Sequence, residues 1–194
     1  MLPPGEWHCP NCTCKFCGLA NGPLHKEDES TINSLHTCNL CEKKFHDCCT
    51  KEMDALPTNS DFSGPSFCGK GCKEFFEHLK KYLGPKHELD AGLTWSLIRR
   101  TDDDSDAASR GITQRVECNS KLAVALTVMD ECFLPVVDRR SGVNILHNVL
   151  YNTGSNFSRL NYTGFYTVIL ERGDEMISAA SIRYYASDLA FHVL

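Results

Sequence analysis

The sequence lacks any long apolar run, and this absence argues against a membrane-spanning helix. No stretch approaches the roughly 20 apolar residues that such a helix needs. Residues 1–6 have neither a basic start nor an apolar core, so they do not resemble a secretory leader. Disulfide frameworks belong to oxidising compartments. We therefore expect no membrane partner and cysteines that stay reduced.

The chain also lacks a positive net charge. Its 194 residues include 20 Lys and Arg against 25 Asp and Glu, which gives a net charge of −5. Proteins that bind DNA through its phosphates carry a basic excess, so direct DNA binding is not expected. The acidic run at residues 102–106 lacks the spacing of an EF-hand calcium loop. It favours a solvated, exposed loop over residues 101–114.

Cysteine, by contrast, is abundant and unevenly distributed. Ten of the 12 cysteines lie in the first 72 residues. Seven of them and one histidine form four closely spaced pairs: Cys14 and Cys17, Cys38 and Cys41, His46 and Cys49, Cys68 and Cys72. Thiolate and neutral imidazole are the ligands of tetrahedral zinc, and eight ligands suffice for two ions. The spacing therefore predicts two bound Zn²⁺ ions.

The order of these pairs, four cysteines, one histidine and three cysteines, resembles a PHD finger. The resemblance implies a cross-brace, in which Cys14 and Cys17 share one zinc with His46 and Cys49. The second zinc would be held by Cys38, Cys41, Cys68 and Cys72. Two features depart from the family pattern: Ser66 stands where a tryptophan is usual, and the last pair has three intervening residues.

PHD fingers bind peptides, and the resemblance implies a peptide site here. The segment before the second pair is expected to accept a peptide as an added strand; it comprises Ser34, Leu35, His36 and Thr37. The acidic residues of the long first loop are expected either to be solvated or to pair with basic residues of a histone H3 tail; they are Glu27, Asp28 and Glu29. Phe45 is expected to fill the small core of the finger.

Two cysteines precede the four pairs. Cys9 and Cys12, with Trp7 shortly before them, resemble the closing end of another PHD finger. The resemblance implies that residues 1–13 are the tail end of an upstream finger and that the two thiols are half of a metal site. The alternative is two unliganded thiols in a flexible tail.

The second half reads as a separate α/β domain. A helix over residues 73–83 closes the finger region, 14–84, and Gly84 and Pro85 end it. The hydrophobic pattern then predicts a strand at 93–98, helices from residue 119 or 120 to 132 and over 144–151, and strands at 165–170 and 176–184. The two strands are expected to be joined by a turn at 171–175, where Gly173 can adopt a positive φ.

This order is how a GNAT acyltransferase begins, and the residues extend the likeness. Segments 93–100, 125–133 and 164–174 resemble plant nuclear proteins that join PHD fingers to a GNAT domain, the Increased DNA Methylation family. The resemblance implies an α+β chain: a small two-zinc cross-brace finger, then the N-terminal half of a GNAT-like domain at 90–194. The Gln/Arg-x-x-Gly-x-Gly/Ala loop that binds acetyl-CoA pyrophosphate is absent. No catalytic residue is assigned, and acetyl-CoA is expected only in a full-length relative.

Three hypotheses follow. The first is a nuclear zinc-finger protein of chromatin that binds a histone H3 tail or another chromatin protein. The second is a histone acetyltransferase of the GNAT type, a function expected of the full-length relative. The third is a RING-like ubiquitin ligase, although such fingers usually place a histidine directly after the third cysteine.

Overall fold

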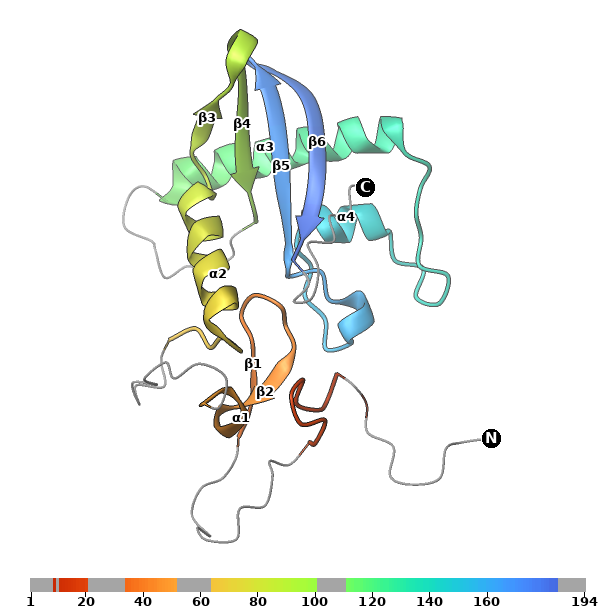
Figure 1. Ribbon diagram of the computed structural model, residues 1–194. Coiled ribbons are helices and arrows are strands. Elements are labelled where there is room, and N and C mark those ends of the chain that lie inside the picture. The colour runs from red at the N-terminus through yellow and green to blue at the C-terminus, as the bar shows by residue number, and fades with distance from the viewer. Residues whose placement is uncertain (1–8, 10, 21–33, 52–63, 101–110, 185–194) are drawn as a thin grey trace, which may run out of the picture. The chain divides into compact units, whose positions relative to one another are not determined.

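The computed structural model describes residues 9, 11–20, 34–51, 64–100 and 111–184. They belong to two compact units, residues 1–78 and 79–194, each of which is described by itself. The chain is a mixed α+β protein, as predicted (Figure 1). Within the described residues, no helix has the length and apolar character needed to cross a membrane.

The first unit is built around a short hairpin. Strands β1 (Leu35–Thr37) and β2 (Lys44–His46) pair antiparallel, and helix α1 (Asp47–Lys51) follows β2 directly. Phe45 is buried as predicted. Apart from cysteines, Leu40 and Phe45 are the buried apolar side chains among the described residues of this unit. Two such side chains are too few to stabilise a fold without help from another source.

Helix α2 (Lys70–Tyr82) begins three residues earlier than predicted, which places Cys72 in its first turn. It ends at Tyr82, one residue before the predicted end, and Gly84 beyond it adopts the positive φ expected of a helix stop, 101°. In the middle of the helix, the Phe76 ring lies 5.1 Å from the Phe67 ring. At its end, in the second unit, the Tyr82 ring lies 5.9 Å from the Trp95 ring.

The second unit contains a four-stranded antiparallel sheet in the order β3-β4-β5-β6. Its strands are β3 (Lys86–Glu88), β4 (Leu93–Ile98), β5 (Phe165–Arg172) and β6 (Glu175–Arg183), and a 3-10 turn, η1 (Asp90–Gly92), joins the first two. The prediction for β4 is confirmed to the residue. Strand β3 was not predicted, since three residues are too few to show a period.

The predicted turn at 171–175 is wrong in extent. Strands β5 and β6 include Glu171, Arg172 and Glu175, so the connection is only two residues long. Gly173 has the expected positive φ, 61°. Glu171 was expected to lie in this turn. It is buried instead, because the ammonium groups of Lys86 and Lys121 each lie 3.2 Å from its Oε2 atom.

Helix α3 (Gly111–Cys132) starts well before the predicted residue 119 or 120. Residues 111–114 are therefore helical and do not belong to the expected acidic loop, of which 101–110 lie outside the described residues. Glu117 and Lys121 form an i,i+4 ion pair of 3.5 Å across the predicted start. Asn119 and Ser120, which were predicted as caps, are exposed within the helix.

The core of the second unit lies between α3 and one face of the sheet. Figure 1 shows α3 passing behind the strands, and α4 (Ile145–Leu150) joins the same core. The buried cluster contains Ile98, Leu122, Ala125, Met129, Leu146, Leu150 and Ile169. On α3, Leu122, Ala125 and Met129 are buried, whereas Val124 and Cys132 are exposed, as is Phe133 directly after the helix. On α4, Leu146, Val149 and Leu150 are buried. A second 3-10 turn, η3 (Ser158–Leu160), precedes β5.

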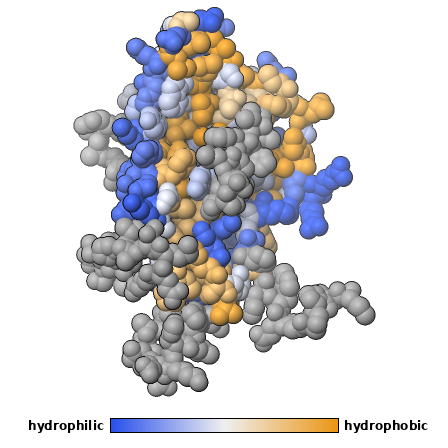
Figure 2. Space-filling view, viewed as in Figure 1, coloured by the Kyte–Doolittle hydropathy of each residue, from blue (hydrophilic) through white to orange (hydrophobic). Residues whose placement is uncertain are grey.

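The opposite face of the sheet is also apolar. Because side chains alternate along a strand, this face carries Trp95, Leu97, Tyr166, Val168, Leu170 and Ile182. Figure 2 shows hydrophobic atoms along the described part of this face. The sheet thus presents apolar side chains on both faces, as in sheets that are covered on both sides.

Replacing Ile169 with alanine is expected to destabilise the second unit by about 2–5 kcal/mol, the usual cost of a cavity at a buried Ile position. Ile169 is fully buried at the centre of the sheet, whereas Ile177 on β6 is 42% exposed. Ile177→Ala is the matched control and should cost about 1 kcal/mol or less. Urea denaturation followed by circular dichroism measures both; equal losses would contradict the assigned core.

Candidate metal centres

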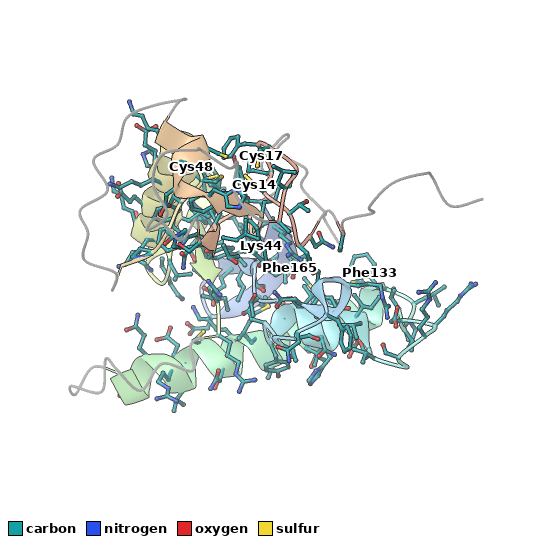
Figure 3. The ribbon with its side chains drawn as sticks, turned by 90° about the horizontal axis from the view of Figure 1, so that it is seen from below. Cys14, Cys17, Lys44, Cys48, Phe133 and Phe165 are labelled. Carbon is teal, nitrogen blue, oxygen red and sulfur yellow. The ribbon has the colours of Figure 1, made fainter. Side chains whose placement is uncertain are left out.

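The first ligand group joins the start of the chain to the corner between β2 and α1. Ligand atoms of Cys14, Cys17, His46 and Cys49 all lie within 4.8 Å of one another. His46 is the last residue of β2, and Cys49 lies one turn further on in α1. Figure 3 shows Cys14 and Cys17 beside each other. The corner thus brings together two pairs that lie about thirty residues apart.

The orientation of His46 suits a metal ligand. Its Nδ1 atom faces two sulfurs, 3.5 Å from Cys17 Sγ and 3.9 Å from Cys49 Sγ. Its Nε2 atom lies 3.4 Å from the carbonyl oxygen of Ala20, to which an Nε2–H can donate. That hydrogen bond favours the tautomer with a free lone pair on Nδ1, which is how metal-ligating histidines are held.

The second ligand group is formed by a tight turn and the start of α2. Ligand atoms of Cys38, Cys41, Cys68 and Cys72 also lie within 4.8 Å of one another, and all four residues are buried. The Cys41 and Cys68 sulfurs are 3.7 Å apart, and those of Cys68 and Cys72 are 3.6 Å apart. In the turn, Cys38 N–H donates to the carbonyl of Lys43. The turn and the helix start thus aim their sulfurs at a common point.

These separations fit tetrahedral zinc. With Zn–S near 2.3 Å and Zn–N near 2.0–2.1 Å, tetrahedral geometry places two sulfurs about 3.8 Å apart and sulfur about 3.6 Å from nitrogen. The observed 3.6 and 3.7 Å between sulfurs, and 3.5 and 3.9 Å from sulfur to Nδ1, are close to those values. A disulfide would need about 2.0 Å, and all 12 cysteines are unpaired. Both groups can therefore each hold one zinc ion.

The pKa shifts of the clustered cysteines also favour a bound cation. Hydrogen bonds from the Cys41 and Cys68 thiols lower the pKa of Cys38 far below the usual thiol range. Hydrogen bonding to Cys38 raises the pKa of Cys41, while burial and the nearby Cys38 charge raise the pKa of Cys72 to about 12. The Cys38 thiolate thus opposes ionisation of Cys41 and Cys72. A divalent ion would supply the positive charge that lets all four ionise.

The first group behaves in a similar way. Burial opposes ionisation of Cys14, but backbone hydrogen bonds from Cys17, Phe16 and His46 outweigh it and lower the pKa of Cys14 to about 6. Burial and hydrogen bonding to Cys17 raise the pKa of Cys49. The Cys14 thiol thus ionises readily, whereas the Cys49 thiol is expected to ionise only when a metal ion binds.

The expected peptide segment lies on β1. Leu35, His36 and Thr37 form the strand, and Ser34 precedes it, with its Oγ atom 2.7 Å from His36 Nε2. The same Nε2 atom lies 3.1 Å from an Asp47 carboxylate oxygen. The other expected peptide contacts, Glu27, Asp28 and Glu29, lie outside the described residues.

Cys9 and Cys12 belong to neither four-ligand group found among the described residues. They form a tight turn of their own, in which Cys12 N–H donates to the Cys9 carbonyl over 2.8 Å. Cys48 lies beside the first group, with its sulfur 4.0 Å from that of Cys49.

Two features of the centres have no strong sequence signal. Asn39 and Ser66 exchange hydrogen bonds of 2.7 and 2.8 Å, which fasten the Cys38 turn to the segment before Cys68. Lys15, between two ligands of the first group, donates through Nζ to Cys68 Sγ in the second group over 3.2 Å. Both contacts join residues that are distant in sequence.

Comparison with known proteins places this arrangement in a family. Residues 133–191 match the family described as Increased DNA methylation 1, C-terminal domain. Increased DNA methylation 1 of Arabidopsis thaliana is 38% identical over 191 residues, which cover 98% of this chain and 16% of that protein. The chain belongs to the Increased DNA methylation 1 family. The resemblance noted in segments 93–100, 125–133 and 164–174 is thus confirmed.

The relationship to Increased DNA methylation 1 extends over both units, since nearly the whole chain is aligned. The chain spans only about a sixth of the length of that relative, 16%. No solved structure matches the chain.

Proposed function

We propose that this chain is a nuclear zinc-finger protein of chromatin. Its first unit would bind two zinc ions and an extended segment of a histone H3 tail or another chromatin protein. The two ligand groups support the zinc part of the proposal. The name of its relative, Increased DNA methylation 1, supports a role in chromatin regulation.

One observation carries the peptide part: β1 has a free edge. Within the described residues, the small sheet has two strands, and β1 pairs with β2 alone. Cys38 N–H donates to Lys43, and pairs in an antiparallel ladder alternate between bonded and non-bonded. The pair His36–Phe45 is therefore a bonded one. The N–H and C=O groups of Leu35 and Thr37 then point outward, where a peptide strand can pair with them.

The surroundings of β1 favour a basic peptide. Asp47 keeps a carboxylate beside His36, and its side chain is 47% exposed. The chain as a whole carries a net charge of −5. Opposite charge raises the rate of encounter and orients the partner. A lysine- and arginine-rich tail is therefore the class of peptide that this edge suits best.

Thr37→Pro is expected to weaken binding of a histone H3 tail peptide by at least about tenfold. Proline removes the outward N–H that the peptide would accept from, and its ring occupies the edge. One lost backbone hydrogen bond is worth about 0.5–1.5 kcal/mol, and the steric clash adds to this. Titration of the zinc-loaded chain, followed by backbone amide NMR shifts, measures the change.

Thr37→Val is the matched control, since it keeps the N–H and the shape of the side chain. Both variants should retain two zinc ions, because the Thr37 N–H does not point at β2. No shift at residues 34–37 of the wild-type chain with millimolar peptide would overturn the strand-addition proposal. Equal binding by Thr37→Pro and Thr37→Val would overturn it as well.

A further inference from the structure

The side chain of Lys15 reaches from one ligand group to the other. Lys15 directly follows Cys14 of the first group, and its Nζ atom donates to Cys68 of the second group over 3.2 Å. The backbone N–H of Lys15 donates to the Lys44 carbonyl over 2.9 Å, which ties the residue to β2. The ammonium also lies 5.0 Å from the centre of the Phe16 ring. One backbone contact and one ring contact thus support the residue whose ammonium donates to the sulfur.

The charge of the second group explains what such a contact does. Four thiolates around one Zn²⁺ carry a net charge of −2, and all four of these cysteines are buried. A buried net charge is costly unless an opposite charge or a hydrogen bond offsets it. Within the described residues, Lys15 is the cation whose side chain donates to a sulfur of this group. Hydrogen bonds to a charged acceptor are shorter and stronger than neutral ones.

We propose that Lys15 is a positioning residue of the second metal centre, which retains zinc and shields the Cys68 sulfur through its N–H···S hydrogen bond. The inference rests on the proposed zinc occupancy of both groups. Lys15 directly follows Cys14, a ligand of the first centre. Metal binding at the first centre therefore also fixes the position of the Lys15 ammonium beside the second centre. The two centres are therefore linked by this side chain as well as by the backbone.

Lys15→Met tests the proposal, since it keeps the length of the side chain and removes the charge and the donor. Loss of an outer-shell partner typically costs about 10–100-fold in metal affinity. Competition against a chromophoric zinc chelator should show one of the two zinc ions bound about tenfold more weakly, with the other unchanged. Iodoacetamide labelling and peptide mapping should then show faster modification of Cys68 and its three partners than of the first group.

Two variants serve as controls. Lys43→Met removes the same charge from another exposed lysine, on the turn that carries Cys38 and Cys41, and should leave both affinities unchanged, because no hydrogen bond from the Lys43 side chain to a sulfur is found among the described residues. Lys15→Arg restores a charged donor and should recover most of the affinity. Wild-type amide spectra of zinc-saturated Lys15→Met would show that the fold is intact.

Lys15→Met affinities within about twofold of wild type would overturn the proposal. Equal weakening by Lys15→Met and Lys43→Met would also overturn it, because that would be a general charge effect. A wild-type chain that binds fewer than two zinc ions would overturn the proposed zinc finger itself and this inference with it. That result appears before any variant is made, so the two failures are distinguishable.

Discussion

Replacing His46 with alanine is expected to reduce bound zinc from two ions per chain to at most one and to unfold the first unit. His46 is fully buried, and its Nδ1 atom faces the sulfurs of Cys17 and Cys49 at 3.5 and 3.9 Å. Alanine would leave three thiols and an open coordination position in the group. The segment with Cys14 and Cys17 would then lose the metal-mediated link to His46 of β2 and keep only the Lys15–Lys44 backbone hydrogen bond. Metal analysis and native mass spectrometry give the zinc content.

His78→Ala is the matched control, since His78 is exposed on α2 and belongs to neither ligand group. It should retain two zinc ions and the wild-type spectrum. Cys48 is close enough to replace the lost imidazole, because its sulfur lies 4.0 Å from that of Cys49. The double variant His46→Ala/Cys48→Ser removes that substitute. Two zinc ions in the double variant would contradict the role given to His46.

The ligand pairs could be read from the sequence because their chemistry and spacing are local. A cysteine two or three residues from another ligand can share an ion with it whatever the rest of the fold does. Which pair meets which other pair is a long-range question. The expected grouping came from the resemblance to a PHD finger, and the structure brings the same two sets of four ligands together. Physical chemistry of single residues could not have given it, because every pair has similar donors.

The contacts that fasten the centres could not be predicted. Lys15 and Cys68 are 53 residues apart, and Asn39 and Ser66 are 27 residues apart. A lysine between two cysteines is expected to be solvent-exposed, and Lys15 is exposed, but its ammonium still contacts the Cys68 sulfur. Only the folded hairpin, with Lys15 N–H bound to Lys44, brings the ammonium to the sulfur. Such contacts depend on strand register and on the course of the loops, and neither can be predicted from the amino-acid composition.

The errors in the second unit concern where elements begin and end. Polar residues at 119 and 120 favoured a helix start there, but the i,i+4 pair of Glu117 and Lys121 spans them, and the helix begins at Gly111. Glu171 was placed in the turn, but it belongs to β5, where Lys121 of α3 and Lys86 of β3 pair with it in a buried position. This second error has a tertiary cause, because Lys121 and Glu171 are 50 residues apart.

Removing zinc with a chelator is expected to unfold the first unit and leave the core of the second unit intact. Structural zinc supplies apparent folding free energy on the order of 10–16 kcal/mol. In the described part of the first unit, only Leu40 and Phe45 add buried apolar side chains to the cysteines. The second unit has its own cluster around Leu122, Met129 and Ile169, which contains no metal ligand. Stability in the two units therefore has separate sources.

Hydrogen exchange with mass spectrometry measures this difference residue range by residue range. With zinc, amides of β1, β2 and the turn between them should exchange slowly; after chelation they should exchange at the rate of an unstructured peptide. Amides of β4 and β5, the central strands, should keep their protection in both conditions, because each is paired on both sides. Adding zinc back should restore the hairpin and change nothing in β5. If β4 and β5 lose protection together with the hairpin, the second unit depends on the metal centres, and the assignment of independent stability is wrong.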